Sequence, residues 1–196
     1  MKKINFFPVL LISAVTVLIF LSGSLTELFE LNKYCEWWQV WRLITGHFTH
    51  WGAEHLFYDL GMFTVLGLIC VNINRKAFYI LIFVIPFISS LIILNFSGIT
   101  CYRGLSGIDT GLFTFLSLEL IRRFIKNKKY ISAGTAVLAV TMLLLKTCYE
   151  ASTGNMIFVS EGFTLCISAH LTGIVCGFFI QTLKNFINIY PSKIIK

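Results

Sequence analysis

A single serine, Ser106, stands among glycines where the chain reads Gly-Leu-Ser-Gly-Ile-Asp-Thr-Gly over residues 104–111 and an apolar run begins. A histidine, His170, stands in a second stretch rich in small residues, Ala-His-Leu-Thr-Gly-Ile-Val-Cys-Gly, over residues 169–177. A serine hydroxyl is a weak nucleophile until a base takes its proton, and a histidine can later return that proton to a leaving amine. The two residues are therefore candidates for a Ser–His dyad, with no third acidic member indicated.

The spacing of the glycines indicates how the two stretches meet. Each stretch has two glycines four residues apart, Gly107 with Gly111 and Gly173 with Gly177. Such pairs form a small face on a helix, and two small faces let helix backbones approach closely. If these faces meet, the serine and the histidine lie on one seam. The alternative is a packing serine and a histidine that only bridges helices; the paired glycines favour the dyad.

Further polar side chains interrupt the apolar runs at a similar depth. His55 and Asp59 are four residues apart and share one face of a predicted helix, with His50 just before it. Asp109 follows Ser106 by three residues. An ionisable group inside a membrane span is costly to bury, so it indicates a functional role. Polar groups at one depth in three separate runs predict a single shared site.

The elements that must position these residues are strongly apolar. The chain has 196 residues, of which 57% are hydrophobic and 13% charged, and its mean hydropathy is +0.81. A soluble domain of this size could not bury so much apolar surface, so we predict an integral membrane protein. Six apolar runs approach the ~20 residues that cross a bilayer, at about residues 6–23, 53–71, 78–97, 105–121, 131–148 and 163–183. They predict one all-α membrane domain over residues 1–196, a six-transmembrane-helix bundle.

The positions of the basic residues predict the orientation of this bundle. The net charge is +7, but the lysines and arginines lie in short loops, where positive charge marks the cytoplasmic side; this excludes a nucleic-acid surface. If six helices alternate, twelve of the 16 basic residues fall on one side: Lys2, Lys3, Arg75, Lys76, Arg122, Arg123, Lys126, Lys128, Lys129, Lys184, Lys193 and Lys196. We therefore expect both termini in the cytoplasm. The outer loop 24–52 is too polar to span and has tryptophans suited to an interfacial segment.

The six cysteines indicate no metal site. No Cys-x-x-Cys motif and no His/Cys spacing of the kind that binds metal occurs. Cys35, Cys101 and Cys148 fall on or near the outer side, where two of them could form a disulfide in an oxidising compartment. The other three are interpreted as small apolar residues of the helices, namely Cys70, Cys166 and Cys176.

With these motifs in order, the sequence resembles the rhomboid family of intramembrane serine proteases over most of its length. The Gly-x-Ser-Gly-x-x-x-Gly motif runs from Gly104 to Gly111, and Ala-His-x-x-Gly-x-x-x-Gly runs from Ala169 to Gly177. Two further family patterns precede them, Trp-Arg at Trp41 and Arg42, and His-x4-His-x3-Asn at His50, His55 and Asp59. The short six-helix build, with Thr-Gly-His-Phe-Thr-His over residues 45–50, resembles the rhombosortase branch in particular.

The resemblance implies roles for the polar residues. It makes Ser106 the nucleophile and His170 the general base. It assigns stabilisation of the oxyanion to His55, to residue 59 and to the Ser106 backbone N–H, with Gly104 beside them. Preorganised donors of this kind are each worth ~3 kcal/mol of barrier. No cofactor and no metal is implied.

The resemblance also implies a substrate class and a location. Rhomboid proteases cut single-span membrane proteins, here near the outer membrane face, and the rhombosortase branch is associated with removal of C-terminal Gly-Gly-type sorting tails. We therefore expect transmembrane protein substrates, a lipid environment and a multi-pass protein of a bacterial inner membrane. In the outer loop, Trp41, Arg42 and His50 would organise the chain above the site.

Two positions depart from the common family pattern. Residue 59 is Asp where the family commonly has Asn. A protonated Asp59 could donate a hydrogen bond to the oxyanion. Alternatively, an ionised Asp59 could accept a hydrogen bond from His55 and orient it, and we favour this role. Residue 110 is Thr where many rhomboids have a Tyr that packs on the catalytic histidine. Another aromatic, Tyr58 or Phe113, is a candidate substitute for that Tyr. Asp109 has no role in the family pattern, although negative charge is favourable at a helix N-terminus.

Two other functions compete with proteolysis. A catalytically silent rhomboid-like protein would bind membrane partners without cutting them, and the presence of both Ser106 and His170 disfavours it. A small transporter or proton relay could use His55, Asp59 and His170, but the sequence shows no inverted repeat or paired broken helices.

Overall fold

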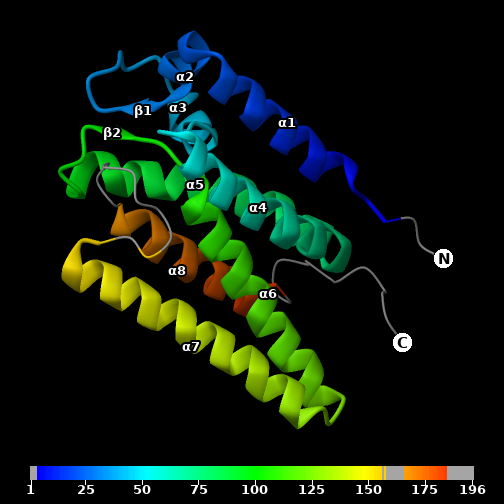
Figure 1. Cartoon of the computed structure of the whole chain (residues 1–196). Coiled ribbons are helices and arrows are strands. Elements are labelled where there is room, and N and C mark those ends of the chain that lie inside the picture. The colour runs from blue at the N-terminus through cyan, green and yellow to red at the C-terminus, as the bar shows by residue number, and fades with distance from the viewer. Residues whose placement is uncertain (1–3, 156, 158–165, 185–196) are drawn as a thin grey trace.

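The computed structural model describes residues 4–155, 157 and 166–184, and almost all of this chain is helical (Figure 1). Its elements in order are α1 (Phe7–Leu21), α2 (Gly23–Phe29), β1 (Leu31–Asn32), α3 (Arg42–Thr45), a 3₁₀ turn η1 (Gly46–Phe48), α4 (Ala53–Ile73), α5 (Arg75–Phe96), β2 (Cys101–Tyr102), α6 (Ser106–Lys126), α7 (Tyr130–Thr153) and α8 (Ile167–Leu183). The two short strands pair antiparallel, Leu31 with Tyr102 and Asn32 with Cys101. This pair joins the long first loop to the segment that precedes Ser106.

Each predicted apolar run overlaps one helix, but fewer helices qualify as membrane spans by length and composition. Three described helices do so, α4, α5 and α7, and a fourth span results if α1 and α2 are one broken span. α8 is a shorter apolar helix, and the start of its predicted run, residues 163–165, lies outside the described residues. The structure thus supports a mostly helical, multi-pass membrane protein with three to four candidate spans.

The first apolar run forms α1, and a second helix, α2, follows at once within the stretch predicted as the outer loop. Ser22 has an extended backbone, and α2 leaves α1 at an angle of 111°. The carbonyl of Ile19 accepts both the Ser22 N–H at 3.2 Å and the Thr26 hydroxyl at 2.9 Å. These bonds satisfy the carbonyl that the break leaves without its helical partner. The interruption therefore carries its own hydrogen bonds, which apolar periodicity does not reveal.

Helix α6 is the centre of the molecule. Its most extensive packing is against α8, and it also contacts α7, α4 and α5. Figure 1 shows α6 crossing the bundle between α4 on one side and α7 on the other. Three of its apolar side chains, Ile108, Leu112 and Phe115, are fully buried. A position within α6 is therefore fixed by several neighbouring helices at once.

Glycines make the contact between α6 and α8 possible. A Cβ added to Gly173 would overlap the Gly107 carbonyl and the Thr110 hydroxyl. One added to Gly177 would overlap the Gly111 carbonyl. Because lipid supplies no hydrophobic drive between helices, close backbone packing of this kind carries their association.

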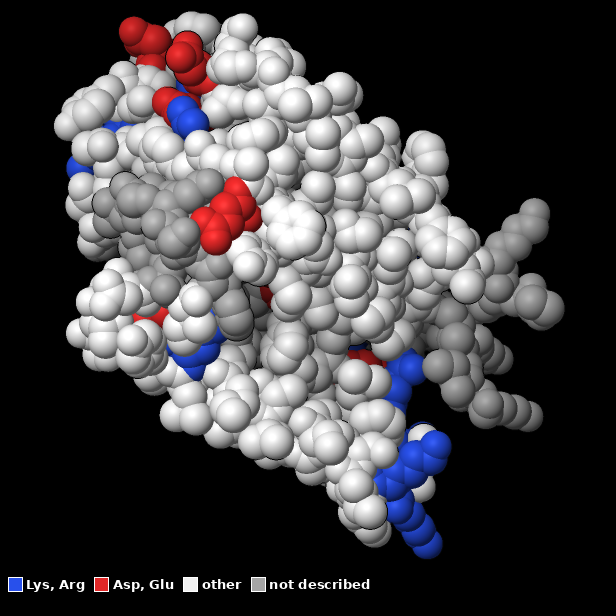
Figure 2. Space-filling model, in the orientation of Figure 1, with Lys and Arg blue, Asp and Glu red and all other residues white. Residues whose placement is uncertain are grey.

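A buried ionic cluster joins the other end of the same two helices. Glu119 of α6 is 1% exposed, and its carboxylate accepts from Arg123 Nε at 2.6 Å, from Gln181 Nε2 at 2.8 Å and from Lys184 Nζ. Figure 2 shows one group of lysines and arginines near the turn where α6 meets α7 and further basic residues toward the opposite end, with a broad uncharged surface between them. The cluster holds α6 and α8 in register at the end away from Ser106.

The glycine contact yields a stability test. Gly173→Ala places a methyl group against the α6 backbone, so we expect the free energy of unfolding to fall by about 1–3 kcal/mol. Gly134→Ala in α7 is the matched control, because nothing lies within 4 Å of its added Cβ; the better helix propensity of Ala predicts no loss there. Thermal unfolding in detergent measures both. Equal melting temperatures for the two variants would contradict the role of the contact.

Candidate active site

Ser106 is the first residue of α6, and the turn before it is pressed against α4. Gly104 has φ +135°, a backbone conformation that favours glycine. A Cβ there would lie 2.9 Å from two atoms of the His55 ring and 3.3 Å from Asp59 Oδ2. The next residue, Leu105, donates its N–H to Asp59 Oδ2 at 2.8 Å. The serine is therefore positioned by a glycine turn and by a carboxylate of another helix.

His170 is buried in α8, across the seam from the start of α6. A Cβ at Gly107 would lie 3.1 Å from the Ala169 carbonyl, so the residue after the serine contacts the residue before the histidine. Thr110 donates its hydroxyl to the carbonyls of Gly107 at 2.9 Å and His170 at 3.3 Å. The threonine thus binds the backbone of the histidine, whereas the tyrosine that many rhomboids have at this position packs on the histidine ring.

Ser106 and His170 share the seam without a hydrogen bond between them among the described contacts. The Ser106 hydroxyl instead interacts with Tyr102, whose own hydroxyl donates to the Gly104 carbonyl at 2.9 Å. Burial raises the pKa of Tyr102 well above its ordinary value, so the phenol stays protonated beside the serine. Hydrogen bonds of catalytic groups are commonly long before substrate binds.

An acid that the sequence did not indicate faces the other side of His170. Glu150 Oε2, near the end of α7, lies 3.5 Å from His170 Nδ1, and the Glu150 side chain is only 2% exposed. Lys146 Nζ holds both carboxylate oxygens at 2.7 Å, and the Ile157 N–H donates to Oε1 at 3.3 Å. The sequence indicated no third acidic member, and the structure places this carboxylate beside His170. A Lys-x-x-x-Glu pair at the end of the apolar run 131–148 marks Glu150 as a paired acid, but it does not indicate that the acid faces His170.

Three polar residues gather at the start of α4. His50 Nε2 lies 3.4 Å and His55 Nε2 3.1 Å from Asp59 Oδ2, and all three residues are buried. The two imidazole rings meet edge-on, with centroids 5.0 Å apart. Burial lowers the pKa of His50, with Asp59 opposing that shift, so His50 outside the helix is neutral at pH 7. Asp109, in the first turn of α6, is buried as well, and its carboxyl oxygens have no hydrogen-bond partner among the described residues.

The loop above the site is tied down by one arginine. Arg42 donates from Nη1 to the carbonyls of Glu27 and Glu30, both at 2.8 Å, and from Nε to Gln39 at 2.8 Å. Trp41 donates its indole N–H to a backbone carbonyl at 3.3 Å. The remaining Trp side chains of the loop, Trp37, Trp38 and Trp51, are exposed, as an interfacial segment requires.

The motif over residues 45–50 has a structural explanation. A Cβ at Gly46 would lie 2.6 Å from the Leu31 backbone nitrogen, so the loop passes directly against β1. His47 is fully buried, 3.3 Å from the Ser90 hydroxyl of α5, and burial lowers its pKa to about 3. Gly46 lets the loop pack against β1, and the neutral His47 packs against Ser90 of α5. All six cysteines are free thiols, so the structure has no disulfide at Cys35, Cys101 or Cys148.

The deciding comparison is with protein-family models. A model described as the rhomboid domain matches residues 37–184, which include the arginine of the loop, the α4 cluster, the serine and the histidine. The chain belongs to the rhomboid family. Rhomboid domains are generally those of intramembrane serine proteases, so this rhomboid implies that type of activity and membrane-protein substrates. No curated protein sequence matches the chain.

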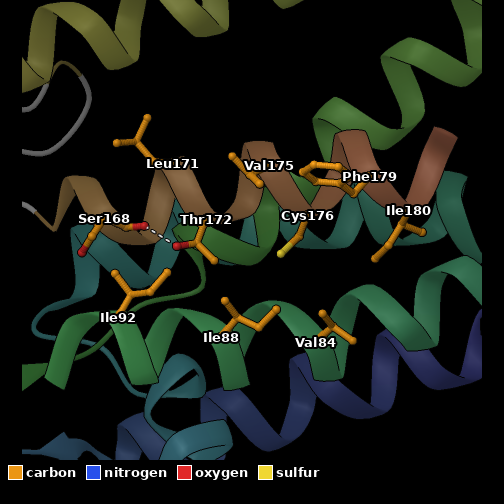
Figure 3. Close-up of a pocket in the computed structure, with 10 residues that line it drawn as sticks. All are labelled: Val84, Ile88, Ile92, Ser168, Leu171, Thr172, Val175, Cys176, Phe179 and Ile180. Atoms are coloured by element: carbon orange, nitrogen blue, oxygen red, sulfur yellow. Dashed lines mark hydrogen bonds between the residues drawn. The ribbon is translucent and has the colours of Figure 1, made fainter. Parts of the chain in front are cut away.

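An apolar groove of this rhomboid lies away from the serine. Figure 3 shows it between α5 and α8, with a volume of about 510 Å³. Ile88 points toward α8, and Thr172 and Cys176 point toward α5. The other lining residues are Val84, Ile92, Ser168, Leu171, Val175, Phe179 and Ile180. Such a lining suits a hydrocarbon chain and offers no acid or base.

The glycine turn yields a second test. Gly104→Ala combines backbone strain with a collision against His55 and Asp59, and we expect it to abolish labelling of Ser106 by an active-site phosphonate. Gly98→Ala is the matched control, since Gly98 also has positive φ (+72°) but open space around an added Cβ. Strain alone costs of order 1–3 kcal/mol, so the control should lose stability yet keep labelling. If both variants fold and neither is labelled, the contact of Gly104 with α4 is not what positions Ser106.

Proposed function

We propose that this protein is an intramembrane serine endopeptidase in which Ser106 is the nucleophile and His170 the general base. The observation that carries the proposal is the seam, where the first turn of α6 meets Ala169 and His170 across paired glycines. His170 Nε2 takes the hydroxyl proton as Ser106 Oγ attacks the scissile carbonyl. It then gives that proton to the leaving amine, and water hydrolyses the acyl-enzyme.

Glu150 completes this arrangement as a positioning residue. With Nδ1–H of His170 directed at the Glu150 carboxylate, the lone pair of Nε2 is left for the serine proton. The same carboxylate stabilises the imidazolium that forms during attack. Its double contact with Lys146 fixes the carboxylate at 2.7 Å, so the acid is held before substrate arrives.

The oxyanion is stabilised from the opposite side. The backbone N–H of Ser106 belongs to the first turn of α6, where amide hydrogens have no helical acceptor and the helix dipole favours negative charge. His55 supplies a side-chain donor. Asp59 accepts the Leu105 N–H and faces both imidazoles, which supports the orienting role and not a donor role.

The number of membrane helices, their orientation and the substrate class are proposed from the family and from the charge pattern. We propose a single domain over residues 1–196 with six membrane helices, in which α6 and α8 also cross the bilayer beside the candidate spans. Both termini are then cytoplasmic, because the Lys- and Arg-rich turns share one side. Ser106 faces the outer side of a bacterial inner membrane. Resemblance of residues 45–50 to the rhombosortase branch supports C-terminal Gly-Gly-type sorting tails as the substrates.

Labelling by a fluorophosphonate tests the proposed function directly. We expect the wild-type protein in detergent to bind the probe covalently, because only an activated serine attacks phosphorus at a useful rate. Ser106→Ala and His170→Ala should not be labelled. A folded wild-type protein that stays unlabelled would indicate a rhomboid that binds membrane proteins without cleaving them.

The role of Glu150 has its own signature. Glu150→Gln keeps the shape but removes the charge that stabilises the imidazolium, so we expect kcat/KM to fall at least about tenfold. The acid limb of the pH–rate profile should also move to lower pH. Glu36→Gln, at an exposed loop position, is the matched control. A lower rate with an unmoved profile would assign Glu150 a purely structural role.

A further inference from the structure

The cluster at the start of α4 has the composition and dimensions of a metal site. His50, His55 and Asp59 each offer one ligand atom, and these atoms lie within 4.8 Å of one another. The two Nε2–Oδ2 distances are 3.4 and 3.1 Å. Tetrahedral zinc with bonds of about 2.0–2.1 Å sets its ligand atoms about 3.3 Å apart. A single ion placed between the three side chains therefore needs little rearrangement.

One of the three side chains, His50, lacks good hydrogen bonds in the absence of an ion. His50 is 1% exposed, and neither ring nitrogen has a hydrogen-bond partner among the described residues. A buried polar atom without a partner is costly and requires an explanation. The ion-pair partners of Asp59 within the described chain are two imidazoles, with no Lys or Arg. A dication would balance the carboxylate and bind a ring nitrogen of His50.

The existing contacts leave room for coordination. Asp59 Oδ2 accepts the Leu105 N–H at 2.8 Å, but a carboxylate oxygen has two lone pairs and can bind a metal with the other. Such an outer hydrogen bond also orients a ligating carboxylate. Asp59 lies six residues beyond the start of α4, about 9 Å along the helix axis. The cluster is thus near the end of the helix, within reach of ions from water.

We propose that His50, His55 and Asp59 form a Zn²⁺ site and that the bound ion inhibits the protease. Imidazole and carboxylate ligands suit Zn²⁺, and three protein ligands leave a fourth position for water. Asp at residue 59, where an amide is common in the family, supplies the charged ligand. The ion takes the Nε2 lone pair of His55 and so engages the side chain that the proposed function assigns to the oxyanion. The inhibition rests on the proposed function, whereas the binding does not.

Binding is measured on a protein that cannot react. We would titrate the full-length Ser106→Ala protein in detergent with Co²⁺, which reports its geometry by absorption, and displace it with Zn²⁺. We expect one Co²⁺ per chain. Asp59→Asn and His50→Gln should each weaken binding more than about 100-fold, because even outer partners of ligands are worth 10–100-fold.

Asp109→Asn is the matched control, a buried carboxylate in the first turn of α6 that is not in the cluster; its Co²⁺ affinity should stay unchanged. Circular dichroism checks that each variant is folded. A folded Ser106→Ala protein without specific Co²⁺ absorption would overturn the site. So would absorption that survives Asp59→Asn.

Inhibition is measured on the wild-type protein. Zn²⁺ should slow fluorophosphonate labelling at least tenfold, and EDTA should restore the rate. Unchanged or faster labelling, with Co²⁺ still bound, would overturn the inhibitory role and indicate a harmless or assisting ion. If the wild type never labels, the proposed protease fails, while the Co²⁺ titration still decides the metal site.

Discussion

The close approach of α6 and α8 is the contact on which the rest of the structure depends. In lipid, apolar side chains gain nothing by leaving their surroundings, so helices associate where their backbones fit tightly. Glycines at the facing positions allow that fit, and the Glu119 cluster fixes the register at the far end. The serine and the histidine are each one residue from the glycine contact. Their relative position is therefore a property of the backbone packing.

A second constraint fixes the serine from the side of α4. Asp59 binds the peptide N–H just before Ser106, and Gly104 is shaped to let this carboxylate and the neighbouring imidazole come close. One carboxylate thus serves the backbone turn and the histidine cluster together. An asparagine at residue 59 could accept the same backbone hydrogen bond but would not carry the negative charge. The Asp at this position changes the electrostatics of the site more than its shape.

Much of the helical framework follows from sequence, because apolar runs and glycine spacing are local patterns. The sites of all six long helices, the pairing of α6 with α8 and the polar cluster of α4 are of this kind. The 111° break after α1 was not predicted, since it depends on hydrogen bonds to one carbonyl inside an apolar run. Glu150 was not predicted either. Its meaning depends on which side of α8 the helix α7 occupies, and no pattern within α7 carries that information.

Glu150 lies on α7, the helix that leaves more of its apolar window exposed than α4 or α5 does. Only 11% of the apolar window of α7 is buried, against 44% for α4 and 50% for α5. The glycines and the Glu119 cluster hold α6 and α8 together at both ends of their contact, whereas α7 packs on α6 with one face and leaves most of its apolar surface exposed. A sideways displacement of α7 would lengthen the 3.5 Å contact with His170 while the serine stayed in place. The partner of His170 thus lies on a helix whose outer surface is largely exposed, so a lateral force on α7 would act on this contact before it acted on the α6–α8 seam.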